Sequence, residues 1–382
     1  MRLRNLLWLV PTAAVLLLVL PTGALAQPVN SVSPNVTIAA QGAVFTMTNN
    51  PHHNAVLAYA IGPGGALIPV GQFSTHGKGT GGSLADQNAI TLTNDHHWLL
   101  VINAGSNSIS VFRVNSLSRN GPILAFVDQV WSHGPVPVSI AVHGSFVYVL
   151  NAGSTTVAGN IFGFFLADQG LLFPLPGSSR ALSTSTSTEP AEIAFNPAGN
   201  ALVVTEKATS SIDTYLVGHQ GYVSGPTVAS SNGATPYGFA FGRAGTLVVS
   251  DAGPGGLSSY SISNSGTLTA KSGPVLDGQV AACWVATTDG GRIAFTSNAD
   301  SMSISSYRVG THGGLSLISS VAATTGAGDT DLAIGGSHNQ YLFVHDGSAD
   351  ELEEFAIGSH GGLTQLYAVF AVSPTAEGLA AF

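Results

Sequence analysis

The sequence has few charged residues and only one cysteine. Charged side chains make up 8% of its 382 residues, and acidic residues outnumber basic ones by 20 to 11. A chain with a formal net charge of −9 is repelled by nucleic acid and by anionic lipid, so neither is expected as a partner. The single Cys283 excludes an intramolecular disulfide. Its apolar surroundings predict a small buried side chain rather than a reactive thiol.

Long apolar runs are also missing, except at the N-terminus. Two arginines precede an apolar stretch from Leu6 to Leu20, and Ala24-Leu25-Ala26 then supplies the small residues that signal peptidase recognises. We therefore expect a secretory signal at residues 1–26, a leader at residues 27–40 and a single folded domain at residues 41–382. The mature chain is expected to be secreted and to have no membrane-inserted segment.

Familiar catalytic and cofactor motifs are absent as well. The sequence contains neither HExxH nor CxxC, and no serine stands in a G-x-S-x-G elbow. Gly77-Lys-Gly-Thr-Gly-Gly82 formally matches a dinucleotide fingerprint, but no helix is predicted after it. We therefore expect no metal and no cofactor.

What the sequence does contain is an internal repeat. The pattern of a branched aliphatic residue, two variable residues and an aromatic occurs seven times, at an average spacing of about 49 residues. Its aromatic residues are Tyr59, Phe112, Phe164, Tyr215, Tyr260, Tyr307 and Phe355. This period is typical of a four-stranded propeller blade.

Each repeat has the same internal order, and this order predicts four strands. An apolar segment such as residues 190–195 comes first, followed by a turn and a β-branched run such as residues 201–205. The strand with the aromatic residue comes next, and a Gly-Leu segment ends the unit. The sequence therefore predicts an all-β fold, a seven-bladed β-propeller with four-stranded antiparallel blades. Residues 374–382 resemble an opening strand, so we expect the C-terminal strand to close the ring.

One position of the repeat is always polar. It lies six residues before the aliphatic position in six repeats, and ten before it in the third, which has an apparent four-residue insertion. The residues at this position are Asn50, Asn103, Asn151, Glu206, Asp251, Asn298 and Asp346. Two interpretations stay open. In the first, the Asn and Asp side chains stabilise turns by forming hydrogen bonds with the backbone two residues further on. In the second, the same side chains bind a ligand on one face of the ring.

Glu206 differs from the other members of this position. Glutamate forms such turns less well, and the next residue is Lys207. We predict that Glu206 and Lys207 are the catalytic residues if the protein is an enzyme, with Glu206 as acid or base. We also expect Glu192 to lie beside Glu206 and to raise the pKa of one of the pair. Arg180 is a candidate for binding an anionic group of the ligand.

Several segments resemble the lactonase-type propeller family, which includes carboxymuconate cyclases and 6-phosphogluconolactonases. The resemblance runs from about residue 44 to residue 382 and is carried by segments such as Val147-Tyr-Val-Leu-Asn-Ala-Gly153 and Val203-Val-Thr-Glu-Lys207. It implies a Pro-Arg-His segment in a middle blade, but Pro190-Ala191-Glu192 stands there. A Pro-His pair of the preceding blade falls on Pro137-Val138. Only the glutamate of the family's site has a match, Glu206.

Two functions follow as hypotheses. The first is a secreted lactonase or cycloisomerase that acts on a small carboxylated lactone, with Lys207 or Arg180 holding the carboxylate. The second is a non-catalytic extracellular propeller that binds a small molecule or a protein on one face. The fold is compatible with both, and we expect a monomer in either case.

Overall fold

The computed structural model describes residues 41–115, 123–184, 188–326, 328–348, 350–370 and 372–382. The predicted signal at residues 1–26 and the predicted leader at residues 27–40 lie outside the described residues. Within these ranges no helix is long and apolar enough to cross a membrane.

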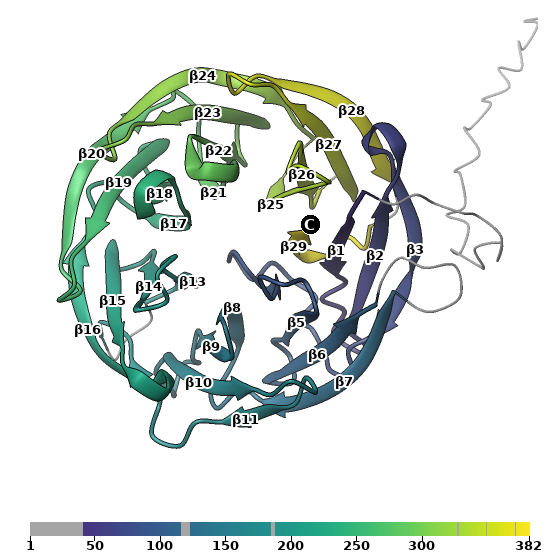
Figure 1. The fold of residues 1–382 in the computed structure, drawn as a ribbon, viewed down its shortest axis with the longest axis vertical. Helices are drawn as coiled ribbons and strands as arrows, with labels where there is room; N and C mark the ends of the chain where they lie inside the picture. The colour runs from purple at the N-terminus through teal and green to yellow at the C-terminus, as the bar shows by residue number, and fades with distance from the viewer. Residues whose placement is uncertain (1–40, 116–122, 185–187, 327, 349, 371) are drawn as a thin grey trace, which may run out of the picture. The chain divides into compact units, whose positions relative to one another are not determined.

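Residues 41–382 fold into seven antiparallel sheets arranged as a ring, as the repeat predicted (Figure 1). The innermost strands, from blade one to blade seven, are β29 (Glu377–Ala381), β4 (Ile90–Leu92), β8 (Pro137–His143), β13 (Pro190–Phe195), β17 (Pro236–Phe241), β21 (Ala282–Thr287) and β25 (Asp329–Gly335). The second strands are β1 (Ala43–Met47), β5 (Trp98–Asn103), β9 (Phe146–Asn151), β14 (Ala201–Glu206), β18 (Leu247–Asp251), β22 (Ile293–Asn298) and β26 (Tyr341–Asp346).

The third strands are β2 (Ala55–Ile61), β6 (Ser108–Val114), β10 (Asn160–Leu166), β15 (Ser211–Val217), β19 (Gly256–Ile262), β23 (Ser303–Val309) and β27 (Glu351–Ile357). The outer strands are β3 (Leu67–Ser74), β7 (Leu124–Trp131), β11 (Leu172–Pro174) with β12 (Arg180–Ala181), β16 (Val223–Ser230), β20 (Leu268–Leu276), β24 (Leu315–Thr324) and β28 (Leu363–Phe370). Short 3-10 turns follow several strands: η1 (Pro63–Gly65), η2 (His219–Gly221), η3 (Arg243–Gly245) and η4 (Asp289–Gly291).

The C-terminal strand closes the ring, as predicted. β29 pairs with β1, with Val44 opposite Ala381 and Phe45 opposite Ala380. Ala43 and Phe382 also exchange two backbone hydrogen bonds of 3.1 Å each. Blade one therefore combines the last strand of the chain with the first three, and β1 is paired on both sides.

The seven repeated aromatic residues lie on the third strands and are buried, with at most 5% of each side chain exposed. Alternation explains this pattern, since every second residue of a strand points to the same face of its sheet. The outer strands consist mostly of exposed or half-buried residues, whereas strands such as β5 and β14 are buried throughout. The core therefore lies between neighbouring blades. Cys283, on β21, is buried as expected.

Blade three departs from the repeat in two ways. Its outer position is divided, because β10 pairs with β11 at one end and with β12 at the other. The connection between β9 and β10 is longer than in other blades, as the apparent insertion indicated. We call residues 152–159 the insertion loop.

Candidate functional site

A segment between β3 and β4 crosses the centre of the ring, and we call residues 83–89 the plug segment (Figure 1). The Gln87 side chain donates to the carbonyl oxygen of Val285 at 2.8 Å and accepts from its N–H at 3.0 Å. The backbone N–H of Gln87 donates to the carbonyl oxygen of Ala191 at 3.0 Å. Trp284 Nε1 donates to the carbonyl oxygen of Asp86 at 2.6 Å. Blades four and six therefore hold the plug segment by hydrogen bonds that each involve at least one main-chain group.

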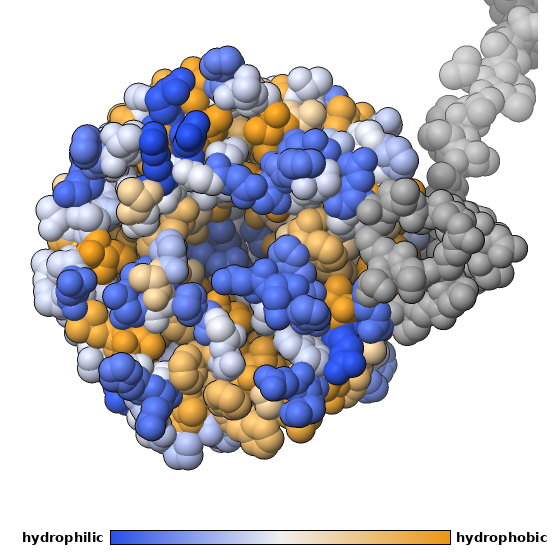
Figure 2. Space-filling view, viewed as in Figure 1, coloured by the Kyte–Doolittle hydropathy of each residue, from blue (hydrophilic) through white to orange (hydrophobic). Residues whose placement is uncertain are grey.

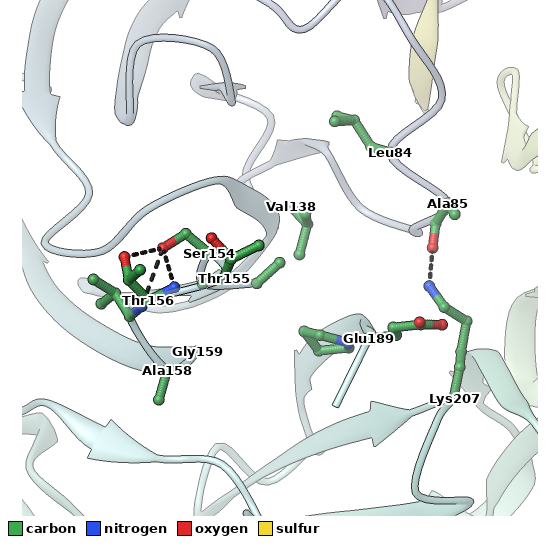
Figure 3. A pocket seen from close by; sticks show the side chains of 14 residues that line it. Leu84, Ala85, Val138, Ser154, Thr155, Thr156, Ala158, Gly159, Glu189 and Lys207 are labelled. Carbon is green, nitrogen blue, oxygen red and sulfur yellow. Dashed lines mark hydrogen bonds between the residues drawn. The ribbon is translucent and has the colours of Figure 1, made fainter. Parts of the chain in front are cut away.

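A pocket of about 650 Å³ opens beside the plug segment (Figure 3). Leu84 and Ala85 of the plug segment form one wall, and the insertion loop forms another. The remaining lining residues are Val138, Glu189, Pro190 and Lys207. We call it the channel-mouth pocket. Its lining combines apolar groups with a few hydroxyls, one ammonium and one carboxylate, which is the composition of a small-molecule site.

Lys207 is the only basic residue in this lining. Its Nζ donates to the carbonyl oxygen of Ala85 at 2.5 Å and lies 4.7 Å from the centre of the Tyr237 ring. Burial lowers the pKa of Lys207, although the Asp86 and Glu189 carboxylates act in the opposite direction. A lysine with a lowered pKa gives up a proton more readily than an exposed one.

Glu189 supplies the only carboxyl group in this lining. Its side chain is exposed, and its backbone has a φ of 48°. Val136, Thr235 and Ala281 also have a positive φ directly before the innermost strand of their blades, so this conformation is a feature of the repeat. The carbonyl oxygen of Glu189 accepts from the N–H of Lys207 at 3.2 Å, so the two residues are neighbours across the ends of β13 and β14.

Four further carboxyl groups are buried around the plug segment: Asp86, Glu192, Asp331 and Glu377. Burial raises the pKa of Glu377 to about 7 and that of the other three well above the ordinary range. The carboxyl oxygens of Asp86 have no hydrogen-bond partner among the described residues. No cluster of three or more His, Cys, Asp or Glu residues in the described part of the chain has metal-binding geometry.

The polar position of the repeat has a common placement. Asn103, Asn151, Glu206, Asp251, Asn298 and Asp346 each end a second strand, and each is fully buried. In blades two to five and in blade seven they contact the connection that enters their own blade, whereas Asn298 donates to the hydroxyls of Ser303 and Ser305 on β23. A Cβ on Gly77, Gly134 or Gly233 would lie within 2.6 Å of Asn103, Asn151 or Asp251, respectively. Asn50 is different, because it lies in the turn after β1 and accepts from the N–H groups of His52 and His53.

Glu206 is packed beneath the connection between β12 and β13. Its carboxylate accepts from the N–H of Ser183 at 2.9 Å, from the Ser183 hydroxyl and from Thr209 Oγ1 at 2.7 Å. Its acidic neighbour is Asp213, on β15. Burial and the charge of Glu206 raise the pKa of Asp213 to about 8. Glu206 does not line the channel-mouth pocket.

The expected pairing of Glu206 with Glu192 is wrong. Glu192 Oε1 accepts from Asn88 Nδ2 and Oε2 from the N–H of Phe239, each at 2.6 Å. A register shift between Pro190 and Glu192 places Glu192 of β13 opposite Thr205 of β14, whose side chain points to the other face of the sheet from that of Glu206. The side chains of the two glutamates therefore contact different partners. Glu192 therefore belongs to the buried group around the plug segment.

Arg180 also lies away from the channel-mouth pocket. It stands on the outer strand β12, and its guanidinium donates to the carbonyl oxygens of Gly177 at 2.9 Å and Ser179 at 2.6 Å. Of the residues predicted from sequence, only Lys207 lines the pocket.

Residues 52–159 match the family described as lactonase, 7-bladed beta-propeller. The chain folds as a seven-bladed β-propeller, and residues 52–159 are similar in sequence to that family. A candidate 6-phosphogluconolactonase from Bacteroides fragilis has a TM-score of 0.72 at 14% identity, covering 91% of this chain and all of that one. The periplasmic gluconolactonase PpgL of Pseudomonas aeruginosa has a TM-score of 0.70 at 15% identity, covering 89% of this chain and 98% of its own. Virginiamycin B lyase from Staphylococcus aureus gives 0.54 at 13%, covering 78% and 88%. No curated protein sequence matches.

The lining of the channel-mouth pocket includes two positions that the sequence resemblance aligns with the family's site. Pro190 begins the segment aligned with Pro-Arg-His, and Val138 stands in place of the histidine of the preceding blade. Both residues line the pocket.

Proposed function

We propose that this propeller hydrolyses or isomerises a small carboxylated lactone in the channel-mouth pocket. The single observation that carries the proposal is that the Lys207 ammonium and the Glu189 carboxyl group line the same pocket, at the position that the family resemblance implies for the site. The volume of about 650 Å³ suits a small molecule. The hydroxyls of Ser154, Thr155 and Thr156 on the insertion loop could hold the polar groups of such a ligand.

The proposed hydrolysis uses Glu189 as the base and Lys207 as the acid. Water attacks the lactone carbonyl carbon while the Glu189 carboxylate accepts its proton, and Lys207 donates a hydrogen bond to the developing oxyanion. The ring C–O bond then breaks, and Lys207 protonates the leaving alkoxide. The lowered pKa of Lys207 favours this proton transfer. Isomerisation needs the same acid and base.

The test is turnover of a panel of aldonolactones, their phosphorylated forms and carboxylated butenolides, with and without divalent metal. Lys207→Met keeps an aliphatic chain over Tyr237 but removes the ammonium, and should lower kcat by about 10²–10⁴-fold. Lys271→Met is the matched control, since Lys271 is exposed on β20. Unchanged turnover in Lys207→Met would remove Lys207 from the mechanism. If the wild type turns over none of the panel, the catalytic proposal fails.

A second candidate function is binding without catalysis. Glu206 is the only match to the family's site residues, and it is buried and fully engaged with Ser183 and Thr209. Calorimetric titration with the same lactones and their hydroxy acids distinguishes the two functions. Binding with no turnover, lost in Lys207→Met, would support the second.

We also propose that the protein is exported, on the strength of its three-part N-terminal signal. Mass spectrometry of secreted protein should find Gln27 as the first residue. A mature N-terminus upstream of residue 20 would contradict this.

A further inference from the structure

A second pocket, of about 300 Å³, is lined by three arginines. Arg243, Arg292 and Arg308 line it together with Val309 and Gly310, and we call it the arginine pocket. It lies on the face that carries η3 and η4, opposite the face of the channel-mouth pocket. Figure 2 shows strongly hydrophilic residues gathered on this face, where Figure 1 labels β21 to β23. The site is therefore independent of the proposed lactone chemistry.

Backbone packing brings the three arginines together. A Cβ on Gly291 would lie 2.3 Å from the backbone nitrogen of Arg243, so the η3 and η4 turns of blades five and six are in direct backbone contact. The N–H of Val309 donates to the carbonyl oxygen of Arg292 at 2.9 Å, which places the end of β23 beside the start of β22. Arg308 is directly opposite Ile293 in this pair of strands. The arrangement thus depends on main-chain contacts rather than on flexible side chains.

Among the described residues, no carboxylate forms an ion pair with these arginines. Over the described residues, the one ion pair joins His97 to Asp95 in blade two, far in the sequence from all three arginines. The acidic residue of η4, Asp289, instead accepts from Asn339 Nδ2 at 2.6 Å. Three like charges in one pocket repel one another, and that repulsion is unfavourable when the pocket is empty. In a chain with 20 acidic residues against 11 basic ones, this grouping indicates an anionic ligand.

We propose that the arginine pocket binds a ligand with a phosphate or pyrophosphate group. Each guanidinium presents paired N–H donors that match the oxygens of a phosphate, and three of them suit an ion of charge −2 or more. A single carboxylate would leave most of the positive charge uncompensated. The phosphate could belong to a soluble molecule or to a lipid headgroup.

The test is calorimetric titration of the mature protein with sodium pyrophosphate and orthophosphate at constant ionic strength. Arg308→Gln should weaken binding by about 10- to 100-fold, the loss expected for hydrogen bonds to a charged group. The triple variant Arg243→Gln, Arg292→Gln and Arg308→Gln should not bind. Arg113→Gln is the matched control, because Arg113 occupies the position of Arg308 in blade two, outside the arginine pocket.

Melting curves establish that each variant is folded. Sedimentation with phosphatidylglycerol vesicles, with phosphatidylcholine vesicles as reference, distinguishes the two sources of phosphate. Co-sedimentation that pyrophosphate abolishes supports a lipid headgroup, and pyrophosphate binding without co-sedimentation supports a soluble ligand. The proposal is overturned if the wild type binds no phosphate at millimolar concentration, or if the triple variant binds as well as Arg113→Gln.

Discussion

The repeated and the non-repeated parts of this propeller have different roles. A polar residue recurs at or near the end of the second strand around the ring, and its side chain is fully buried in six blades. The plug segment and the insertion loop each occur once, and both line the channel-mouth pocket. The repeat therefore builds the scaffold, whereas the exceptions to it build the candidate site. This is the usual division between a rigid fold and the loops that it carries.

The largest effect should come from breaking the scaffold at its closure. Deletion of residues 374–382 removes β29 and leaves β1 without its inner partner. The unpaired edge should cause aggregation or a large loss of stability. Thermal unfolding and size-exclusion chromatography measure both. A truncated protein that melts like the full-length one would show that the C-terminal strand is dispensable.

A smaller effect is expected from pH, through the carboxyl groups buried in the scaffold. The pKa is raised to about 8 for Asp213, about 7 for Glu354 and about 6 for Asp251. The folded state therefore binds more protons than the unfolded state between about pH 4 and pH 8, and stability falls as pH rises through this window. His345 opposes this trend, because burial lowers its pKa to about 4.

Three carboxyl groups with a raised pKa act against one histidine with a lowered pKa. The melting temperature should therefore be higher at pH 5 than at pH 8. Asp213→Asn removes one of the raised groups and should reduce this difference, mainly by raising stability at pH 8. The matched control is Asp168→Asn, in the β10–β11 turn. A melting temperature that rises from pH 5 to pH 8 would contradict the assignment.

The fold could be predicted from the sequence because its signal is periodic. Seven aromatic residues at a near-constant spacing fix the number of blades, and the strand-like end of the chain fixes the closure. The candidate site could not be predicted in the same way. Gln87 holds the plug segment through hydrogen bonds to Val285, which is almost two hundred residues away in the sequence. No local sequence pattern predicts such a contact. The long stretch of sequence between β3 and β4 is the feature that could have indicated the plug segment.

The direction of a side chain was equally hard to predict. Glu192 and Glu206 were expected to lie side by side, but the register shift between β13 and β14 gives their side chains different hydrogen-bond partners. The acidic neighbour of Glu206 is Asp213, two residues before the repeated Tyr215. Alternation along the third strand could have indicated that Asp213 and Tyr215 share a face.

Shortening the insertion loop tests the division of roles directly. Deletion of residues 155–158 leaves Asn-Ala-Gly-Ser-Gly-Asn, which has the length of the Asn103–Ser108 turn in blade two. Because loop length contributes little to stability, the free energy of unfolding should change by less than about 1 kcal/mol. Turnover or ligand binding should be lost, since one wall of the pocket is removed. Full activity in the shortened protein would place the site elsewhere.

The smallest effect on turnover is expected at Glu206, the residue that the sequence favoured most. Its carboxylate is buried, bonded to Ser183 and Thr209 and absent from the pocket lining. Glu206→Gln keeps the acceptor oxygen for one of these partners and should lower stability modestly, by about 1–3 kcal/mol for the disturbed buried hydrogen bonds. Turnover should stay within a few-fold of the wild type. Measuring kcat and melting temperature on the same samples, beside Lys207→Met, separates the two roles. A fall in kcat of about 10²-fold or more in folded Glu206→Gln would restore Glu206 as the acid or base. The repeated position would then contribute to the site as well as to the scaffold.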